Sequence, residues 1–463
     1  MTTLSIEHED RLIWVFTALA GKISATFGDD LDTRLKAIID EKLAEPQTVA
    51  EIGRWEIDWG PVVLQLTDYG QDINAYYGVR SVDDPSKVVL AISGTNPASA
   101  FDWLVEDGFV FQQVSWPGAL GSDPDAKLAL GTALGLNLLL QGKPKAEVVK
   151  PNVGMMAWLR GLTDQGPVKV SVCGHSLGGA LSPALGLWLM DTQGSPNQWD
   201  PAGTSEVAVY PFAGPTPGNP AFSSYYDTKL GGVTRRWWNH YDIVPNAWAQ
   251  SQLQSIPELY VPDIGRDPVI EGLADAARAL AHQGGDYEHV RGDIAPFPAQ
   301  VAADKINPIF PDSVNFFVQL VYQHTKAYDH TFEFPTPAVA PTPPKPGLLS
   351  RAWSWFKSLF SFGAGTAELP EALEETVKVI DEAAKIGDAI AGGIPETISS
   401  GFAKRLSEMG IELPDGIEVA EGMRTKLALG DQEIDWPSAL EDWAGVAAAL
   451  EERLGARCEH CDP

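Results

Sequence analysis

The feature that most constrains this chain is a serine placed between two glycines, where a strand-like sequence passes into a helix-like one. The pentapeptide GHSLG at 174–178 follows the alternating apolar run Val168–Cys173 and precedes the apolar run Ala180–Met190. A serine hydroxyl is a poor nucleophile unless the backbone lifts it clear and a base takes its proton. A sharp strand-to-helix turn does this, and the flanking glycines let neighbouring backbones pass close. The pattern predicts that Ser176 is a nucleophile; the competing interpretation is a passive serine in a glycine-rich turn.

Strand-like and helix-like segments alternate over most of the chain. Residues 1–52 show apolar side chains at helical spacing, which predicts helices. Beyond them, six segments favour strands, with helical patterns between several of them: 60–67, 75–81, 87–92, 168–173, 207–212 and 233–238. Such alternation predicts an α/β protein with a mainly parallel central sheet covered on both faces. With the glycine–serine turn, the expected architecture is the α/β-hydrolase fold, flanked by a helical N-terminal segment and a helical, acidic C-terminal region.

Composition excludes some classes of partner. The chain has 463 residues and a formal net charge of −29, and such a negative field repels phosphate backbones, so no nucleic-acid partner is expected. The three cysteines, Cys173, Cys458 and Cys461, are too few for a disulfide framework. The CEHC sequence near the C-terminus has half of a zinc-site spacing and no second half, so we expect no metal or other cofactor.

No segment of the sequence favours insertion into a membrane. The N-terminal MTTLSIEHEDRL places acidic residues where a secretory leader needs basic ones. The longest apolar stretch, at 128–140, is shorter than the roughly 18 residues that span a bilayer, and it predicts a buried helix. Two locations stay open, the cytoplasm and the outside of the cell after export without a classical signal peptide.

A proline-rich stretch divides the chain. We expect an N-terminal helical segment at 1–52, a catalytic domain at 53–335, a linker with an aromatic helix at 336–365 and an acidic helical region at 366–463. The linker begins with PTPAVAPTPPKPG, which is extended and semi-rigid. Aromatic side chains then recur from Trp353 to Phe360. We favour a helix that docks on protein there, and contact with a lipid surface is the alternative.

The order of residues on this fold narrows the partners of Ser176, because the acid and then the histidine follow the serine along the chain. Asp242 comes directly after an apolar aromatic run and before Pro245, as a triad acid would; a turn-capping aspartate is the competing interpretation. Order alone leaves four histidines: His282, His289, His324 and His330. The apolar run Val314–Tyr322 predicts a last strand or helix with His324 on the loop after it, and His330 is the fallback.

Four stretches together resemble the class 3 lipases, which include the fungal triacylglycerol lipases and their bacterial and plant relatives. VVLAISGT, which ends at Thr95, is similar to the family's strand and R-G-T/S turn, and the family's D-W pair follows as Asp102-Trp103. GHSLGGA is similar to its nucleophile elbow. FAGPTPGNPAF at 212–222 and NHYDIVP at 239–245 resemble its G-x-P-x-x-G-N-x-x-F segment and its N-x-x-D-x-V-P turn. The resemblance runs from about residue 55 to 335.

The resemblance implies roles for single residues. Asp242 would be the triad acid, and His324 would be the base because the family's last histidine often stands in H-x-x-x-Y, as His324 and Tyr328 do. His289, in a Y-x-H segment, would not be catalytic. The oxyanion hole would come from the hydroxyl and amide of Thr95 and from the amide of Leu177.

Two further implications concern the surroundings of the site. Residues 97–116 would form the lid region, and a helical pattern at Glu271–Ala281 lengthens the stretch between acid and histidine and suits a cap over the pocket. The sequence also departs from the family pattern, because Ser93 stands where an arginine is usual before Gly94. That change removes a structural cation from the turn.

These features predict a serine ester hydrolase that acts on lipid esters. His324 would take the proton of Ser176, and Asp242 would hold His324 in the right tautomer. Apolar residues would either line an acyl groove or belong to the core: Phe101, Trp103, Phe109, Val110 and Phe111. One alternative is a phospholipase, exported against other cells. The alternative of another class is a non-catalytic interaction protein on a hydrolase fold.

Overall fold

The computed structural model describes most of the first 333 residues and four short strands beyond them. The described ranges are 1–23, 30–66, 71–94, 110, 112–116, 118, 123–308, 312–333, 397–399, 418–420, 426–429 and 432–435. Several expectations lie outside these ranges: Thr95, Asp102-Trp103, Phe101, Phe109, Phe111, the linker at 336–365 with its aromatic stripe, and Cys458 to Cys461.

The helices and strands follow one another as the alternation predicts. The helices are α1 His8–Ala20, α2 Leu31–Ala44, α3 Pro46–Ile52, α5 Leu130–Gln141, α6 Met155–Thr163, α7 Leu177–Thr192, α8 Pro220–Leu230, α9 Gln250–Ser255, α10 Pro268–Gly284, α11 Asp312–His324 and α12 Lys326–Thr331. The strands are β1 Trp55–Leu66, β2 Gln71–Ser81, β3 Lys87–Ile92, β4 Gln113–Ser115, β5 Lys127–Ala129, β6 Lys169–His175, β7 Glu206–Phe212, β8 Thr397–Ser399, β9 Glu418–Ala420, β10 Lys426–Leu429 and β11 Gln432–Asp435.

The central sheet has the strand order β11-β10-β1-β2-β3-β6-β7. The α/β class is confirmed, and the parallel pairing lies where the candidate serine is: β3, β6 and β7 run parallel, and Ile92 is level with Gly174. The other pairings, from β3 through β2 and β1 to β10 and β11, are antiparallel. The segment expected as a strand at 233–238 continues the parallel side only as single bridges, from Val209 to Thr234 and from Phe212 to Trp237.

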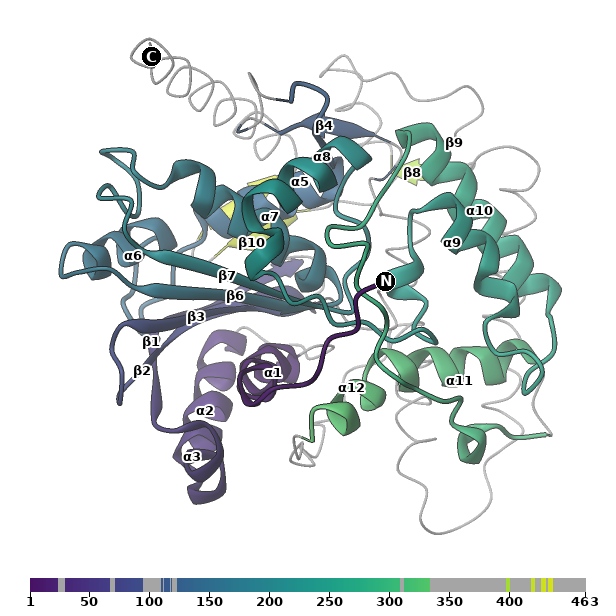
Figure 1. The fold of residues 1–463 in the computed structure, drawn as a ribbon, viewed down its shortest axis with the longest axis horizontal. Coiled ribbons are helices and arrows are strands. Elements are labelled where there is room, and N and C mark those ends of the chain that lie inside the picture. The colour runs from purple at the N-terminus through teal and green to yellow at the C-terminus, as the bar shows by residue number, and fades with distance from the viewer. Residues whose placement is uncertain are drawn as a thin grey trace.

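Helices cover both faces of this sheet (Figure 1). Helices α1 and α2 lie on one face with α3 beside them, and α5, α7 and α8 lie on the other. A buried apolar cluster separates each layer from the sheet, because each strand presents apolar side chains to both sides. The helices expected within residues 1–52 and near 128–140 are confirmed by α1, α2, α3 and α5. Cys173 belongs to one of the two buried clusters, and its burial raises the pKa of the thiol to about 12.

A third apolar cluster holds α9, α10 and α11 together to one side of the sheet (Figure 1). It includes Ile243 and Val244, which directly follow the candidate acid Asp242. Helix α10 contains the helical pattern predicted at Glu271–Ala281. The extra sequence between acid and histidine thus packs against the turn that carries the acid.

The region expected to be helical at 366–463 contributes only strands to the described part of the chain. Strands β10 and β11 form an antiparallel hairpin, and β10 pairs with β1 at Leu64 to Leu66. At these four strands the structure differs from the helical prediction, and the rest of 366–463 lies outside the described residues. A signal for β10 and β11 was present, because KLAL and QEID are separated by Gly430-Asp431, a two-residue hairpin turn sequence. The added hairpin gives partners to the backbone groups at the edge of β1.

In the described part of the chain, no helix combines the length and the apolar character that a bilayer span requires.

Candidate active site

Ser176 occupies the turn between β6 and α7. Its backbone has φ 60° and ψ −125°, a conformation that a residue with a side chain rarely adopts and that costs on the order of 1–3 kcal/mol. Two hydrogen bonds hold the turn: the Ser176 amide donates to the carbonyl of Phe212 over 3.1 Å, and the Gly179 amide donates to the carbonyl of Ser176 over 2.8 Å. The expected strand-to-helix elbow is therefore present.

The glycines of the motif are needed because backbones cross closely here. A Cβ on Gly174 would lie 2.1 Å from the carbonyl oxygen of Gly178, and one on Gly178 would lie 2.4 Å from that of Ile92. Gly94, at the end of β3, lies directly against the serine, since its Cβ would be 2.4 Å from the Cβ of Ser176. Ser176 is itself only 2% exposed.

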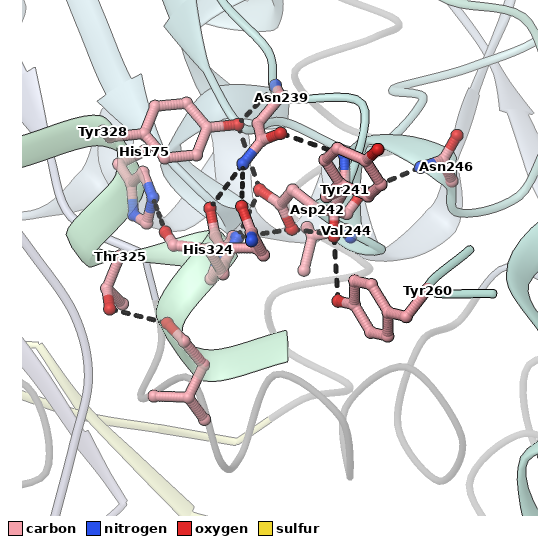
Figure 2. Close-up of polar contacts among 12 residues, drawn as sticks. His175, Asn239, Tyr241, Asp242, Val244, Asn246, Tyr260, His324, Thr325 and Tyr328 are labelled. Carbon is pink, nitrogen blue, oxygen red and sulfur yellow. Dashed lines mark hydrogen bonds and ion pairs between the residues drawn. The ribbon is translucent and has the colours of Figure 1, made fainter. Parts of the chain in front are cut away.

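Asp242 and His324 form the central pair of the site (Figure 2). The Nδ1 of His324 lies 2.8 Å from Oδ2 and 3.0 Å from Oδ1 of Asp242, and both side chains are fully buried. A neutral imidazole facing a carboxylate carries its proton on the facing nitrogen, so Nδ1–H donates and Nε2 keeps its lone pair. Nε2 is buried and has no hydrogen-bond partner among the described residues. His324 is the last residue of α11, one position before the loop on which we expected it.

Asp242 is held by more groups than His324 (Figure 2). The amide of Val244 donates to Oδ1 over 3.0 Å, and the hydroxyl of Tyr328 donates to Oδ2 over 3.0 Å. The same hydroxyl accepts from the amide of Asn239 over 3.1 Å. Burial and the nearby Asp242 raise the pKa of Tyr328 well above its usual value, so its hydroxyl keeps the proton that it donates.

His175 connects the serine turn to this pair. Its Nε2 lies 2.7 Å from the carbonyl oxygen of His324 and donates to it, and the two imidazole rings are 4.5 Å apart (Figure 2). Burial and the neighbouring His324 lower the pKa of His175 well below its usual value. His175 is therefore neutral and adds no positive charge beside His324. The residue before Ser176 thus contacts the residue that we expect to be its base.

The structure also describes three other residues named in the sequence analysis, Leu177, His289 and His330. Leu177 is the first residue of α7, where backbone amides have no partner within the helix. His289 is buried, and its Nε2 donates to the carbonyl of Pro245 over 2.5 Å; His330, the fallback, is exposed on α12. Among the described residues, His324 is the histidine that hydrogen-bonds to Asp242.

Ser93 shows what replaces the family's arginine. Its Oγ accepts from the amide of Ala75 over 2.7 Å, and its carbonyl accepts from Nδ2 of Asn74 over 2.8 Å. Both partners belong to β2, so neutral hydrogen bonds hold the turn at the position where the family pattern has an arginine. Nothing in the sequence pattern pointed to Asn74.

Two described positions within the expected lid region, Val110 and Trp116, are anchored to the body of the domain. The carbonyl of Val110 accepts from the hydroxyl of Tyr287 over 2.6 Å, and Val110 lies in the third cluster. Trp116 is buried and its Nε1 donates to Asp191 over 2.8 Å. Burial raises the pKa of Asp191. Of the candidate groove residues, only Val110 is described, and it is a core residue.

Nothing in the described ranges suggests a metal centre, since no group of three or more histidine, cysteine, aspartate or glutamate side chains converges there. The chemistry available at the site is that of a hydroxyl, an imidazole and a carboxylate.

A serine in a strained strand-to-helix turn, with a buried imidazole–carboxylate pair supplied by later turns of the chain, defines an α/β-hydrolase when it lies on a parallel sheet covered by helices. Within that class, residues 89–252 match the family model "Lipase (class 3)". This match and the lipase structures described next support the class 3 lipase family, and with it a lipid ester hydrolase.

Solved structures of lipases are similar to the chain. M37 lipase shares 28% sequence identity over 70% of this chain and 92% of its own, with a TM-score of 0.60, so the shared unit is nearly all of that lipase. Lipase II from Rhizopus niveus shares 20% identity over 52% of this chain and 76% of its own, with a TM-score of 0.33. The triacylglyceride lipase of Rhizomucor miehei shares 20% over 52% and 75%, with a TM-score of 0.34. No curated protein matches the chain.

Proposed function

We propose that this protein is a serine carboxylic-ester hydrolase that acts on lipid esters by acyl transfer to Ser176. The observation that carries the proposal is the imidazole of His324: its Nδ1 is committed to Asp242, while its buried Nε2 has no partner among the described residues. An unpaired Nε2 is the acceptor that a serine proton needs.

The reaction would proceed in two steps. The Nε2 of His324 takes the hydroxyl proton as Ser176 attacks the ester carbonyl, and Asp242 stabilises the imidazolium that forms. His324 then gives the proton to the leaving alcohol, and water, activated by the same imidazole, releases the acyl group. The amide of Leu177, with the hydroxyl and amide of Thr95, would stabilise the oxyanion in both steps.

One solved structure supports the substrate class, and the backbone of Ser176 supports the type of catalysis. The M37 lipase match extends over 92% of that lipase, which supports ester-linked lipids as the substrate of this chain. The strained, preformed backbone at Ser176 supports covalent catalysis, because such strain persists at functional sites that use it.

Hydrolysis of p-nitrophenyl esters with acyl chains from two to sixteen carbons tests the proposal. We expect wild type to be active, and Ser176→Ala and His324→Ala each to lose on the order of 10³-fold or more of kcat. Ser182→Ala is the matched control, because Ser182 is a fully buried serine on helix α7, which begins directly after Ser176. Full activity of Ser176→Ala would contradict the proposal.

The same preparation separates the alternatives. Release of fatty acid from emulsified triacylglycerol, with no release from phosphatidylcholine vesicles, supports a lipase; the reverse result supports a phospholipase. No turnover of any ester, with or without detergent, would favour a non-catalytic interaction protein.

A further inference from the structure

Helix α1 contributes a side chain to the supports of the candidate triad, although it lies outside the residues that match the lipase family. The family match begins at residue 89, whereas α1 spans His8–Ala20. The helix packs against β3, which ends two residues before Gly94, and against β6, which leads into the serine turn. Side chains of α1 can therefore reach the residues that surround the serine turn.

Trp14 is the side chain of α1 that reaches the site. It is 3% exposed, and its ring contacts His175 edge-on with centroids 5.7 Å apart. It also stacks on Tyr328, with centroids 5.7 Å apart and 26° between the planes. Phe212 and Phe332 close the pocket around it, at 5.1 Å and 5.6 Å. The ring of Trp14 thus contacts both His175 and Tyr328, the two side chains that hydrogen-bond to the His324–Asp242 pair.

Each of these contacts leads to a different member of the pair. His175 donates to the backbone carbonyl of His324, so it helps to fix the position of the base at the end of α11. Tyr328 donates to Oδ2 of Asp242, so it sets the orientation of the acid. If Trp14 is removed, both His175 and Tyr328 gain space to tilt, and the acid and the base lose their supports together.

A buried ionic contact fixes α1 in this place. Asp10, one helical turn before Trp14, is fully buried and accepts from Nε and Nη2 of Arg235, each over 2.6 Å. It also accepts from Nε1 of Trp237 over 2.9 Å. Both donors lie on the segment that leads into the turn of Asp242, so the helix is registered against the chain that carries the acid.

We propose that Trp14 is a positioning residue for ester hydrolysis, holding His175 and Tyr328 so that His324 and Asp242 stay aligned with each other. This inference rests on the proposed function. A misplacement of about 1 Å in catalytic groups can lower a rate on the order of 100-fold, so the effect of losing Trp14 should appear in kcat. Substrate binding should change little, because Trp14 is 3% exposed and its ring contacts are with protein side chains.

The test compares two aromatic residues of the same helix. Phe16 is as buried as Trp14, but its ring packs on Trp55, 5.0 Å away, whereas the ring contacts to His175 and Tyr328 come from Trp14. We expect Trp14→Leu to lower kcat for p-nitrophenyl butyrate 10- to 100-fold with KM within 2-fold of wild type, and Phe16→Leu to keep kcat within 3-fold. Trp14→Phe should recover most of the lost kcat, because it restores an aromatic contact.

Rates are taken per serine labelled by a fluorophosphonate, at a temperature where both variants are folded by near-UV circular dichroism. Should Trp14→Leu not fold, Trp14→Met is compared with Phe16→Met, and the kcat of Trp14→Met should be the lower. Equal kcat for the two aliphatic variants, at Trp14 and at Phe16, would overturn the inference. Inactive wild type, or an active Ser176→Ala, would instead overturn the proposed function, so the two failures are distinct.

Discussion

Tyr328→Phe removes one oxygen atom from the centre of the site and nothing else. That oxygen donates to Asp242 and accepts from the amide of Asn239, and all three groups are buried. A hydrogen bond to a charged group contributes about 1.5–3 kcal/mol, and a buried amide left unpaired costs about 1–3 kcal/mol. We expect the free energy of unfolding to fall by about 3 kcal/mol. At about 2 °C per kcal/mol for a domain of this size, Tm falls by about 6 °C.

Turnover should fall as well, by about 10-fold, because Asp242 loses a donor that fixes its orientation toward His324, and 1.4 kcal/mol of transition-state stabilisation is a factor of about ten. Thermal unfolding and p-nitrophenyl ester hydrolysis measure the two effects. The control is Tyr226→Phe, whose buried hydroxyl shares a neutral hydrogen bond with Thr234 away from the site. It should cost about 1 kcal/mol and leave kcat unchanged. Equal Tm and kcat for the two variants would refute the reasoning.

Two other positions give simpler predictions. Gly94→Ala would place a Cβ 2.4 Å from that of Ser176, so turnover should be lost, whereas Gly154→Ala, with nothing within 4 Å of the new atom, should be silent in the same assay; an active Gly94→Ala would contradict the close packing. Burial holds the pKa of His289 well below its usual value of 6.5. Below pH 6.5 the unfolded chain therefore binds a proton at His289 that the folded protein does not, so the free energy of unfolding falls as the pH falls. His289→Gln should reduce the slope of unfolding free energy below pH 6 by about 1.4 kcal/mol per pH unit in urea titrations, and identical slopes would exclude this.

Ser176 and Asp242 could be located from the sequence because their signals are local. The turn at Ser176 is specified by glycines two residues away on either side and by the strand and helix that flank it. Asp242 follows an aromatic run and precedes Pro245, and the same few residues form its turn. Local backbone chemistry decides both positions, so a short window contains the information.

His324 could not be chosen by the same reasoning. It lies 82 residues after Asp242, and order alone left four histidines. What distinguishes them is burial and packing: His282 and His330 are exposed, and His289 is bonded to a backbone carbonyl. Those properties come from how α11 packs in the third cluster; the apolar run Val314–Tyr322 indicated the element but not its packing.

The sequence pattern also missed Trp14, for a physical reason. An amphipathic pattern predicts one buried face, and Leu12, Val15, Phe16 and Leu19 account for that face of α1. In the structure Ile13, Trp14 and Thr17 are buried too, because one side of the helix packs on the sheet and the other packs against α12 and the segment after β7. The continuous run LIWVF already indicated a helix buried on more than one side. A helix enclosed in this way can transmit its position to a site, and Trp14 is the residue of α1 through which we expect it to do so.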